Sequence, residues 1–151
     1  MIAEDEDAVR DLASSFLKSA GYIVLSARSG GEALECAKRW GKPIHLLLTD
    51  MIMPQMRGSE LARKLRRLHP DIKTVYMSGY HDRDGSEEQP DHGTLLLQKP
   101  FSRDALLRIV AESLEGVIEA EEAASAIRAL ATVPMKSPRR LARRNGRRMV
   151  V

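Results

Sequence analysis

The feature of this sequence that most constrains its fold is an alternation of short apolar runs with segments of helical periodicity. The clearest run, residues 44–49, is almost wholly apolar, as expected for a strand that is covered on both faces. Five such runs are separated by amphipathic segments, an order typical of a parallel sheet with helices on both sides. The runs span residues 1–3, 22–27, 44–49, 74–77 and 94–98. The sequence therefore predicts a doubly wound α/β fold.

Serine N-caps and glycine or proline stop signals delimit the helices between these runs. Four helices are expected, at about 8–20, 29–40, 59–69 and 102–114, with N-caps at Ser29 and Ser102 and a start at Ser59. A fifth helix would be expected between the last two strands. The segment 80–93 contains glycines, Pro90 and many charges, however, and it is a poor helix former.

Length and composition favour one globular domain without a membrane span. The longest apolar runs, such as 46–48 and 95–97, are far too short to cross a bilayer, and no signal-peptide pattern opens the sequence. The single cysteine, Cys36, fits a reducing compartment, and we expect a cytoplasmic location. The first strand has at most three residues, which suggests a late start codon or a fragment of a longer chain.

The charge is unevenly distributed along the chain. Beyond Pro134 there are seven basic residues and no acidic one, which leaves 17 basic and 21 acidic residues before it, a net charge of −4. We therefore expect a domain over residues 1–115, a helical extension over 116–131 and a loose basic tail over 132–151. Such a tail could contact nucleic acid through charge alone, so a nucleic-acid-binding regulator is an alternative hypothesis.

Chemically active side chains follow four of the five predicted strands. They are Glu4 and Asp5 after the first, Asp50 after the third, Ser78 after the fourth and Lys99 after the fifth. In a doubly wound sheet these positions meet at one edge, where ligands bind. Three carboxylates in one place would repel one another, and their oxygens are the ligands that Mg²⁺ prefers. With the ion present, one carboxylate can attack phosphorus while the ammonium and the hydroxyl hold the phosphoryl oxygens.

Residues 1 to about 115 resemble the receiver domain family of response regulators in two-component signalling. The matching motifs are Glu4-Asp5-Glu6, Asp50, Met53-Pro54-Gln55-Met56-Arg57-Gly58, Met77-Ser78-Gly79-Tyr80 and Lys99-Pro100-Phe101. The resemblance implies a flavodoxin-like, five-stranded parallel sheet in the order 2-1-3-4-5. The amino-acid sequence around Ser78 and Lys99 also resembles that of receivers in hybrid sensor histidine kinases.

The resemblance further implies roles for individual residues. Asp50 would accept a phosphoryl group from a histidine kinase or a phosphotransfer protein, and the domain would then signal to a partner. Mg²⁺ would be bound by Asp5, Asp50 and the backbone carbonyl of Ile52, with assistance from Glu4.

The same resemblance implies that Ser78 is the switch hydroxyl, that Lys99 binds the phosphoryl group, and that the Lys99–Pro100 bond is cis. The sequence departs from the family at Leu96, where an aromatic switch residue is common. A Mg²⁺-dependent phosphohydrolase with an aspartyl phosphate is a second alternative. It would need an acidic residue at position 52, where this chain has Ile52, so we expect a phosphoacceptor rather than an enzyme.

Overall fold

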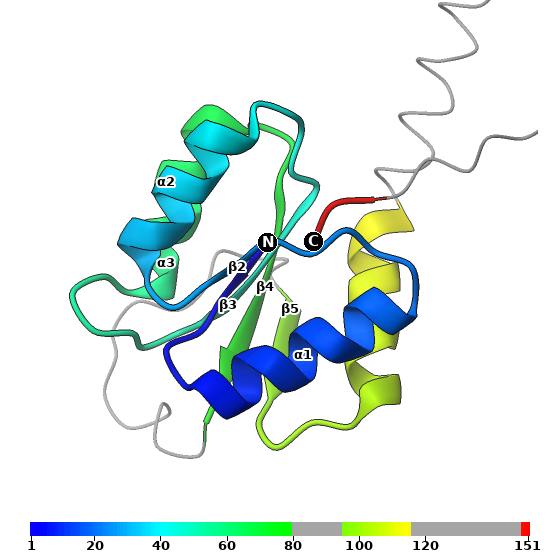
Figure 1. Ribbon diagram of the computed structural model, residues 1–151. Coiled ribbons are helices and arrows are strands. Elements are labelled where there is room, and N and C mark those ends of the chain that lie inside the picture. The colour runs from blue at the N-terminus through cyan, green and yellow to red at the C-terminus, as the bar shows by residue number, and fades with distance from the viewer. Residues whose placement is uncertain (80–94, 116–148) are drawn as a thin grey trace, which may run out of the picture.

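The computed structural model describes residues 1–79, 95–115 and 149–151. Its centre is a parallel five-stranded sheet in the order β2-β1-β3-β4-β5, which confirms the predicted doubly wound fold (Figure 1). The strands are β1 (Ile2–Ala3), β2 (Ser26–Ala27), β3 (Leu46–Asp50), β4 (Lys73–Ser78) and β5 (Leu95–Gln98). All five residues of β3 are buried, as the apolar run predicted for a central strand.

Helices cover both faces of the sheet (Figure 1). The helices α2 (Gly30–Trp40) and α3 (Gly58–Leu68) lie on one face, and their buried residues form one apolar cluster with Leu47 and Ile44. The helix α1 (Asp7–Ser19) and a helix over residues 103–115 lie on the other face, around Leu46 and Leu48. Within the described residues, no helix has both the length and the apolar character needed to cross a membrane.

The two predicted helix caps are confirmed. The Ser29 hydroxyl accepts a hydrogen bond from the Glu32 N–H, and the Ser102 hydroxyl accepts one from the Ala105 N–H. The helix predicted to start at Ser59 begins one residue earlier, at Gly58, and the Arg57 side chain at its N-cap position makes no capping hydrogen bond. Leu12, on α1, keeps 46% of its surface exposed.

The second strand is shorter than the predicted 22–27. A strand is defined by its hydrogen-bonded partner, and β1 offers only Ile2 and Ala3 to pair with Ser26 and Ala27. Ile23 pairs instead with Val150, from the far end of the chain. Residues 149–151 are therefore not part of a loose tail, which was expected over 132–151, because these three apolar residues are hydrogen-bonded to the segment that leads into β2. The poor helix at 80–93, the extension at 116–131 and the tail up to residue 148 lie outside the described residues.

The amino group of Met1 is buried, and it donates a hydrogen bond to the Leu46 carbonyl at 2.6 Å. Burial lowers the pKa of this amine from 8.0 to about 4. Between these pH values the unfolded chain binds a proton that the folded chain does not, so the free energy of unfolding should rise with pH. Urea denaturation between about pH 5 and pH 8 measures this rise. N-terminal acetylation removes the titrating group and should flatten that part of the profile; an unchanged profile would contradict the burial.

Candidate functional site

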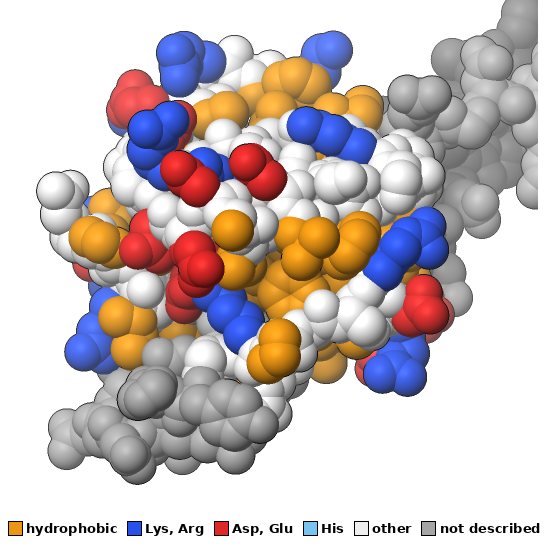
Figure 2. All heavy atoms as spheres, turned by 60° about the horizontal axis from the view of Figure 1, so that its bottom comes forward, with side chains coloured by type: hydrophobic (Ala, Val, Ile, Leu, Met, Phe, Trp, Pro, Cys, Tyr) orange, Lys and Arg blue, Asp and Glu red, His pale blue; other side chains and the backbone are white. Residues whose placement is uncertain are grey.

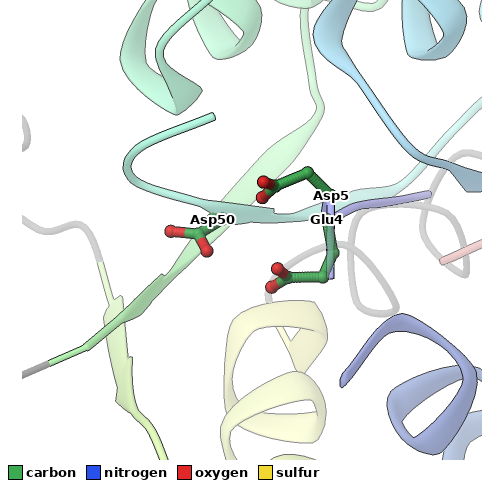
Figure 3. A group of neighbouring side chains, drawn as sticks. All are labelled: Glu4, Asp5 and Asp50. Atoms are coloured by element: carbon green, nitrogen blue, oxygen red, sulfur yellow. The ribbon is translucent and has the colours of Figure 1, made fainter. Parts of the chain in front are cut away.

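The acidic residues predicted at the strand ends come together at one end of the sheet. Glu4 and Asp5 follow β1, and Asp50 is the last residue of the neighbouring strand β3. One carboxylate oxygen from each lies within 4.8 Å of the others, and the three side chains point toward a common space (Figure 3). Acidic side chains also gather on the face shown in Figure 2, which looks onto this end of the molecule.

Glu4 is fully buried, which is unusual for a carboxylate. Its Oε2 lies 2.6 Å from the Lys99 Nζ, and its Oε1 accepts a hydrogen bond from the Glu6 N–H at 3.2 Å. Burial raises the pKa of Glu4, and the charge of Asp50 adds to this, although the Lys99 ammonium opposes it. Glu4 is therefore held by a cation rather than exposed to water.

Asp50 is less buried than Glu4 and is oriented through both of its oxygens. Its Oδ2 lies 2.5 Å from the Lys99 Nζ, and its Oδ1 accepts a hydrogen bond from the Ile52 N–H at 3.1 Å. The side chain keeps 12% of its surface exposed, so a reactant can approach it from solvent. Buried Thr49 fixes the backbone here by donating its hydroxyl to the Asp50 carbonyl at 3.0 Å.

Lys99 connects the two carboxylates from the end of β5. Burial alone would lower its pKa, but the ion pairs with Asp50 and Glu4 outweigh burial and raise it. Its backbone N–H donates to the Ser78 carbonyl at 2.8 Å, and the Lys99–Pro100 peptide bond is cis, as the resemblance implied. Lys99 thus pairs with two of the three clustered carboxylates, and the remaining excess of negative charge favours a further cation at the site.

The other predicted residues lie around this cluster. Ser78 ends β4, is buried, and donates its hydroxyl to the Gly79 carbonyl at 3.2 Å. Ile52 lies in the loop after β3 with 51% of its surface exposed, so its side chain does not fill the site. Leu96, on β5, is 46% exposed.

Two positioning residues could not be predicted from the sequence. Arg10 donates from its guanidinium to the Glu4 carbonyl at 2.9 Å and also pairs with Asp7, so α1 holds the acidic loop. Gly58 lies so close to the end of β3 that a Cβ there would be 2.2 Å from the Asp50 carbonyl oxygen. Arg10 gave no signal because a charged residue in a helix usually faces solvent. Gly58 was seen only as part of a motif, since close backbone approach cannot be read from sequence spacing.

Comparison with known proteins agrees with this geometry. A family model described as the response regulator receiver domain matches residues 1–111. The chain belongs to the receiver domain family. This receiver domain is 41% identical over 116 residues to the sensor kinase CckA of Brucella abortus, a match that covers 76% of this chain and 12% of that kinase.

One further relative and one solved structure support the assignment. The response regulator receiver protein CpdR of Brucella abortus is 38% identical over 80 residues, which cover 53% of this chain and 65% of CpdR. A crystal structure of the receiver domain from the hybrid histidine kinase CckA superposes with a TM-score of 0.65 and 35% identity, covering 76% of this chain and 96% of that one. This chain thus spans less than two thirds of the length of CckA and of CpdR.

Proposed function

We propose that this receiver domain is the phosphoacceptor of a two-component phosphorelay and that Asp50 takes the phosphoryl group. The observation that supports this most strongly is the position of the Asp50 carboxylate. It lies at a strand end, paired with the Lys99 ammonium at 2.5 Å and within 4.8 Å of two more carboxylates. A carboxylate held between a cation and a cation-binding cluster is suited to nucleophilic attack on a phosphoryl group.

The donor set fits Mg²⁺ as the cofactor. Glu4, Asp5 and Asp50 offer hard carboxylate oxygens, and Asp5 is exposed where Glu4 is buried. We propose that Asp5 and Asp50 bind the ion together with the Ile52 carbonyl, and that Glu4 assists. When bound, Mg²⁺ would neutralise charge on the phosphoryl oxygens and on the clustered carboxylates.

The chain's own residues account for the transfer step. A carboxylate oxygen of Asp50 attacks the phosphorus of a phosphohistidine, and a P–O bond forms as the P–N bond breaks. The imidazole leaves with the electron pair of that bond and takes a proton from solvent. The Lys99 ammonium then pairs with the phosphoryl oxygens instead of the free carboxylate, and the Ser78 hydroxyl turns from Gly79 to donate to one of them.

This proposal implies a histidine kinase or a phosphotransfer protein as donor, and the likeness to CckA favours a kinase of the hybrid type. We expect the domain to act in the cytoplasm. It would turn over no external substrate, because Ile52, two residues after Asp50, offers no acid or base. Hydrolysis of its own aspartyl phosphate would be the only turnover.

A small phosphodonor tests the proposal without the kinase. We expect acetyl phosphate with Mg²⁺ to add the mass of one phosphoryl group to the intact chain, and we expect EDTA to prevent the addition. Intact-mass spectrometry at several reaction times measures the labelled fraction. A chain that stays unlabelled with Mg²⁺ present, while its circular dichroism shows the native fold, would refute the phosphoacceptor role.

A second prediction concerns Mg²⁺ binding. Asp5→Ala should weaken Mg²⁺ affinity by roughly tenfold or more, about 1.4 kcal/mol, because it removes an exposed carboxylate of the cluster. Asp7→Ala is the matched control. It makes the same substitution two residues away, at an aspartate that pairs with Arg10 and is not part of the carboxylate cluster. Isothermal titration calorimetry measures both variants. Equal affinities would show that Asp5 acts only through long-range charge and does not bind the ion.

A further inference from the structure

The last three residues of the chain are hydrogen-bonded to the segment that leads into β2. The N–H groups of Ile23 and Leu25 donate to the carbonyls of Met149 and Val151, both at 3.1 Å. In return, the Val151 N–H donates to the Ile23 carbonyl at 2.8 Å. These three bonds form a parallel ladder on one edge of the segment 149–151.

The opposite edge of this segment is bonded to the segment that leads into β3. The N–H groups of His45 and Leu46 both donate to the Val150 carbonyl, at 3.2 and 3.3 Å. The Val150 N–H donates to the Nδ1 of the His45 ring at 3.0 Å. Both edges are therefore used, as in a strand inside a sheet rather than a strand added at its rim.

The side chains show which strand this segment completes. Met149 and Val151 pack into the apolar cluster under α1, and Val150 packs into the cluster under α2 and α3. Met1, Ile2 and Ala3 continue the same alternation, since Ile2 faces α1 and the other two face α2 and α3. Because successive residues of a strand face opposite sides, residues 149–151 and 1–3 follow one unbroken pleat. The two chain ends lie beside each other in Figure 1.

We infer that residues 149–151 are the first half of the strand whose second half is β1, so that a slot in this sheet is filled by the C-terminal end of the same chain. Val150 and Val151 are buried, and their carbonyls and that of Met149 serve four backbone amides of the sheet. Removal of the segment would take these acceptors away from the four amides and expose apolar side chains of both clusters. The slot is thus a site for an extended apolar tripeptide that pairs on both edges.

This strand completion also bears on the acidic loop. Met1 is held by Leu46 and Leu48, and Glu4 follows two residues after Ile2, so the position of β1 sets that of Glu4 and Asp5. Filling the slot from the other chain end would keep β1 in register. The relevance of this register to phosphorylation rests on the proposed function, whereas the strand completion itself does not.

Cross-linking in the full chain tests the inference. Ile23 and Val150 are direct bridge partners in the same apolar cluster, so cysteines at these positions lie within disulfide reach. In a Cys36→Ala background, Ile23→Cys with Val150→Cys should form an intrachain disulfide under mild oxidation, seen by peptide mapping. The control pairs Ile23→Cys with Val133→Cys, which moves the second thiol outside the pairing segment. A yield no higher than the control's, or a link between two chains, would overturn the inference.

Hydrogen exchange on a chain that lacks residues 149–151 gives a second readout. The amides of Ile23, Leu25, His45 and Leu46 should lose protection by about tenfold or more, while that of Met51, which donates to the Met77 carbonyl, keeps its protection. Unchanged protection of the four amides in a folded chain would contradict the inference. If the deletion unfolds the chain, the cross-link still decides. Neither measurement reads phosphorylation, so the inference can fail while the proposed function holds, and the reverse.

Discussion

Asp50→Asn should abolish phosphorylation of this chain by acetyl phosphate. The amide has the same shape as the carboxylate, and its oxygen can still accept the hydrogen bond from the Ile52 N–H, so the loop after β3 should keep its structure. It lacks the negative charge and the nucleophilic oxygen, and neither can be supplied by buried Glu4, which is held by Lys99. Intact-mass spectrometry should show the label in the parent chain and none in the variant.

The matched control is Asp71→Asn, which makes the same chemical change at an exposed position away from the site. It should label as the parent chain does. Equal labelling of Asp50→Asn and the parent chain would place the phosphoryl group on another residue and remove the basis of the proposed function.

Lys99→Met should be the most destabilising substitution at the site. It removes the cation that faces Glu4 at 2.6 Å and Asp50 at 2.5 Å, and it leaves the buried Glu4 carboxylate without a partner of opposite charge. Breaking a buried ion pair on one side typically costs about 3–5 kcal/mol, and the 17% exposure of the lysine side chain places the expected loss at the lower end. Urea denaturation at about pH 7 measures the change in the free energy of unfolding.

The destabilisation should depend on pH in a defined direction. Burial raises the pKa of Glu4 above 4.5, and loss of the ammonium raises it further. A carboxyl group whose pKa is higher in the folded than in the unfolded chain lowers the free energy of unfolding above its folded-state pKa. It has no such effect below its unfolded-state pKa. The deficit of Lys99→Met should therefore shrink as the pH falls from 7 toward 4.5, and Glu4→Gln in the same chain should recover part of it at pH 7. A deficit that does not vary with pH, and that Glu4→Gln leaves unchanged, would mean that lost packing and not charge is responsible.

The sequence allowed the sheet and its active edge to be predicted because the relevant signals are local. The buried run before Asp50, the caps at Ser29 and Ser102, and the polar residues after each strand depend only on neighbours in the chain. Once the sheet is parallel, its strand ends must share one edge, and Glu4, Asp5, Asp50 and Lys99 come together.

What could not be predicted depends on contacts between distant segments. The pairing of Val150 with Ile23 joins residues far apart in sequence, and three apolar residues after an Arg-rich stretch carry no periodic signal. Glu4 is buried and Asp5 is exposed although the two are adjacent in the chain. Which of the two side chains points into the protein depends on the packing of distant segments, so the sequence does not show it. Gly58 likewise matters through its approach to the Asp50 carbonyl, which only the packed loop reveals.

Chemical trapping identifies the residue that bears the phosphoryl group, which we propose to be Asp50. An aspartyl phosphate is an acyl phosphate, and borohydride reduces it to homoserine at the residue that bore it. The chain is phosphorylated by acetyl phosphate with Mg²⁺, reduced with borohydride and digested, and its peptides are sequenced by tandem mass spectrometry. Homoserine at position 50, absent when the phosphodonor is omitted, is the predicted result. Homoserine at Asp5 or at another acidic residue, with an unmodified Asp50, would rule out Asp50 as the phosphoacceptor.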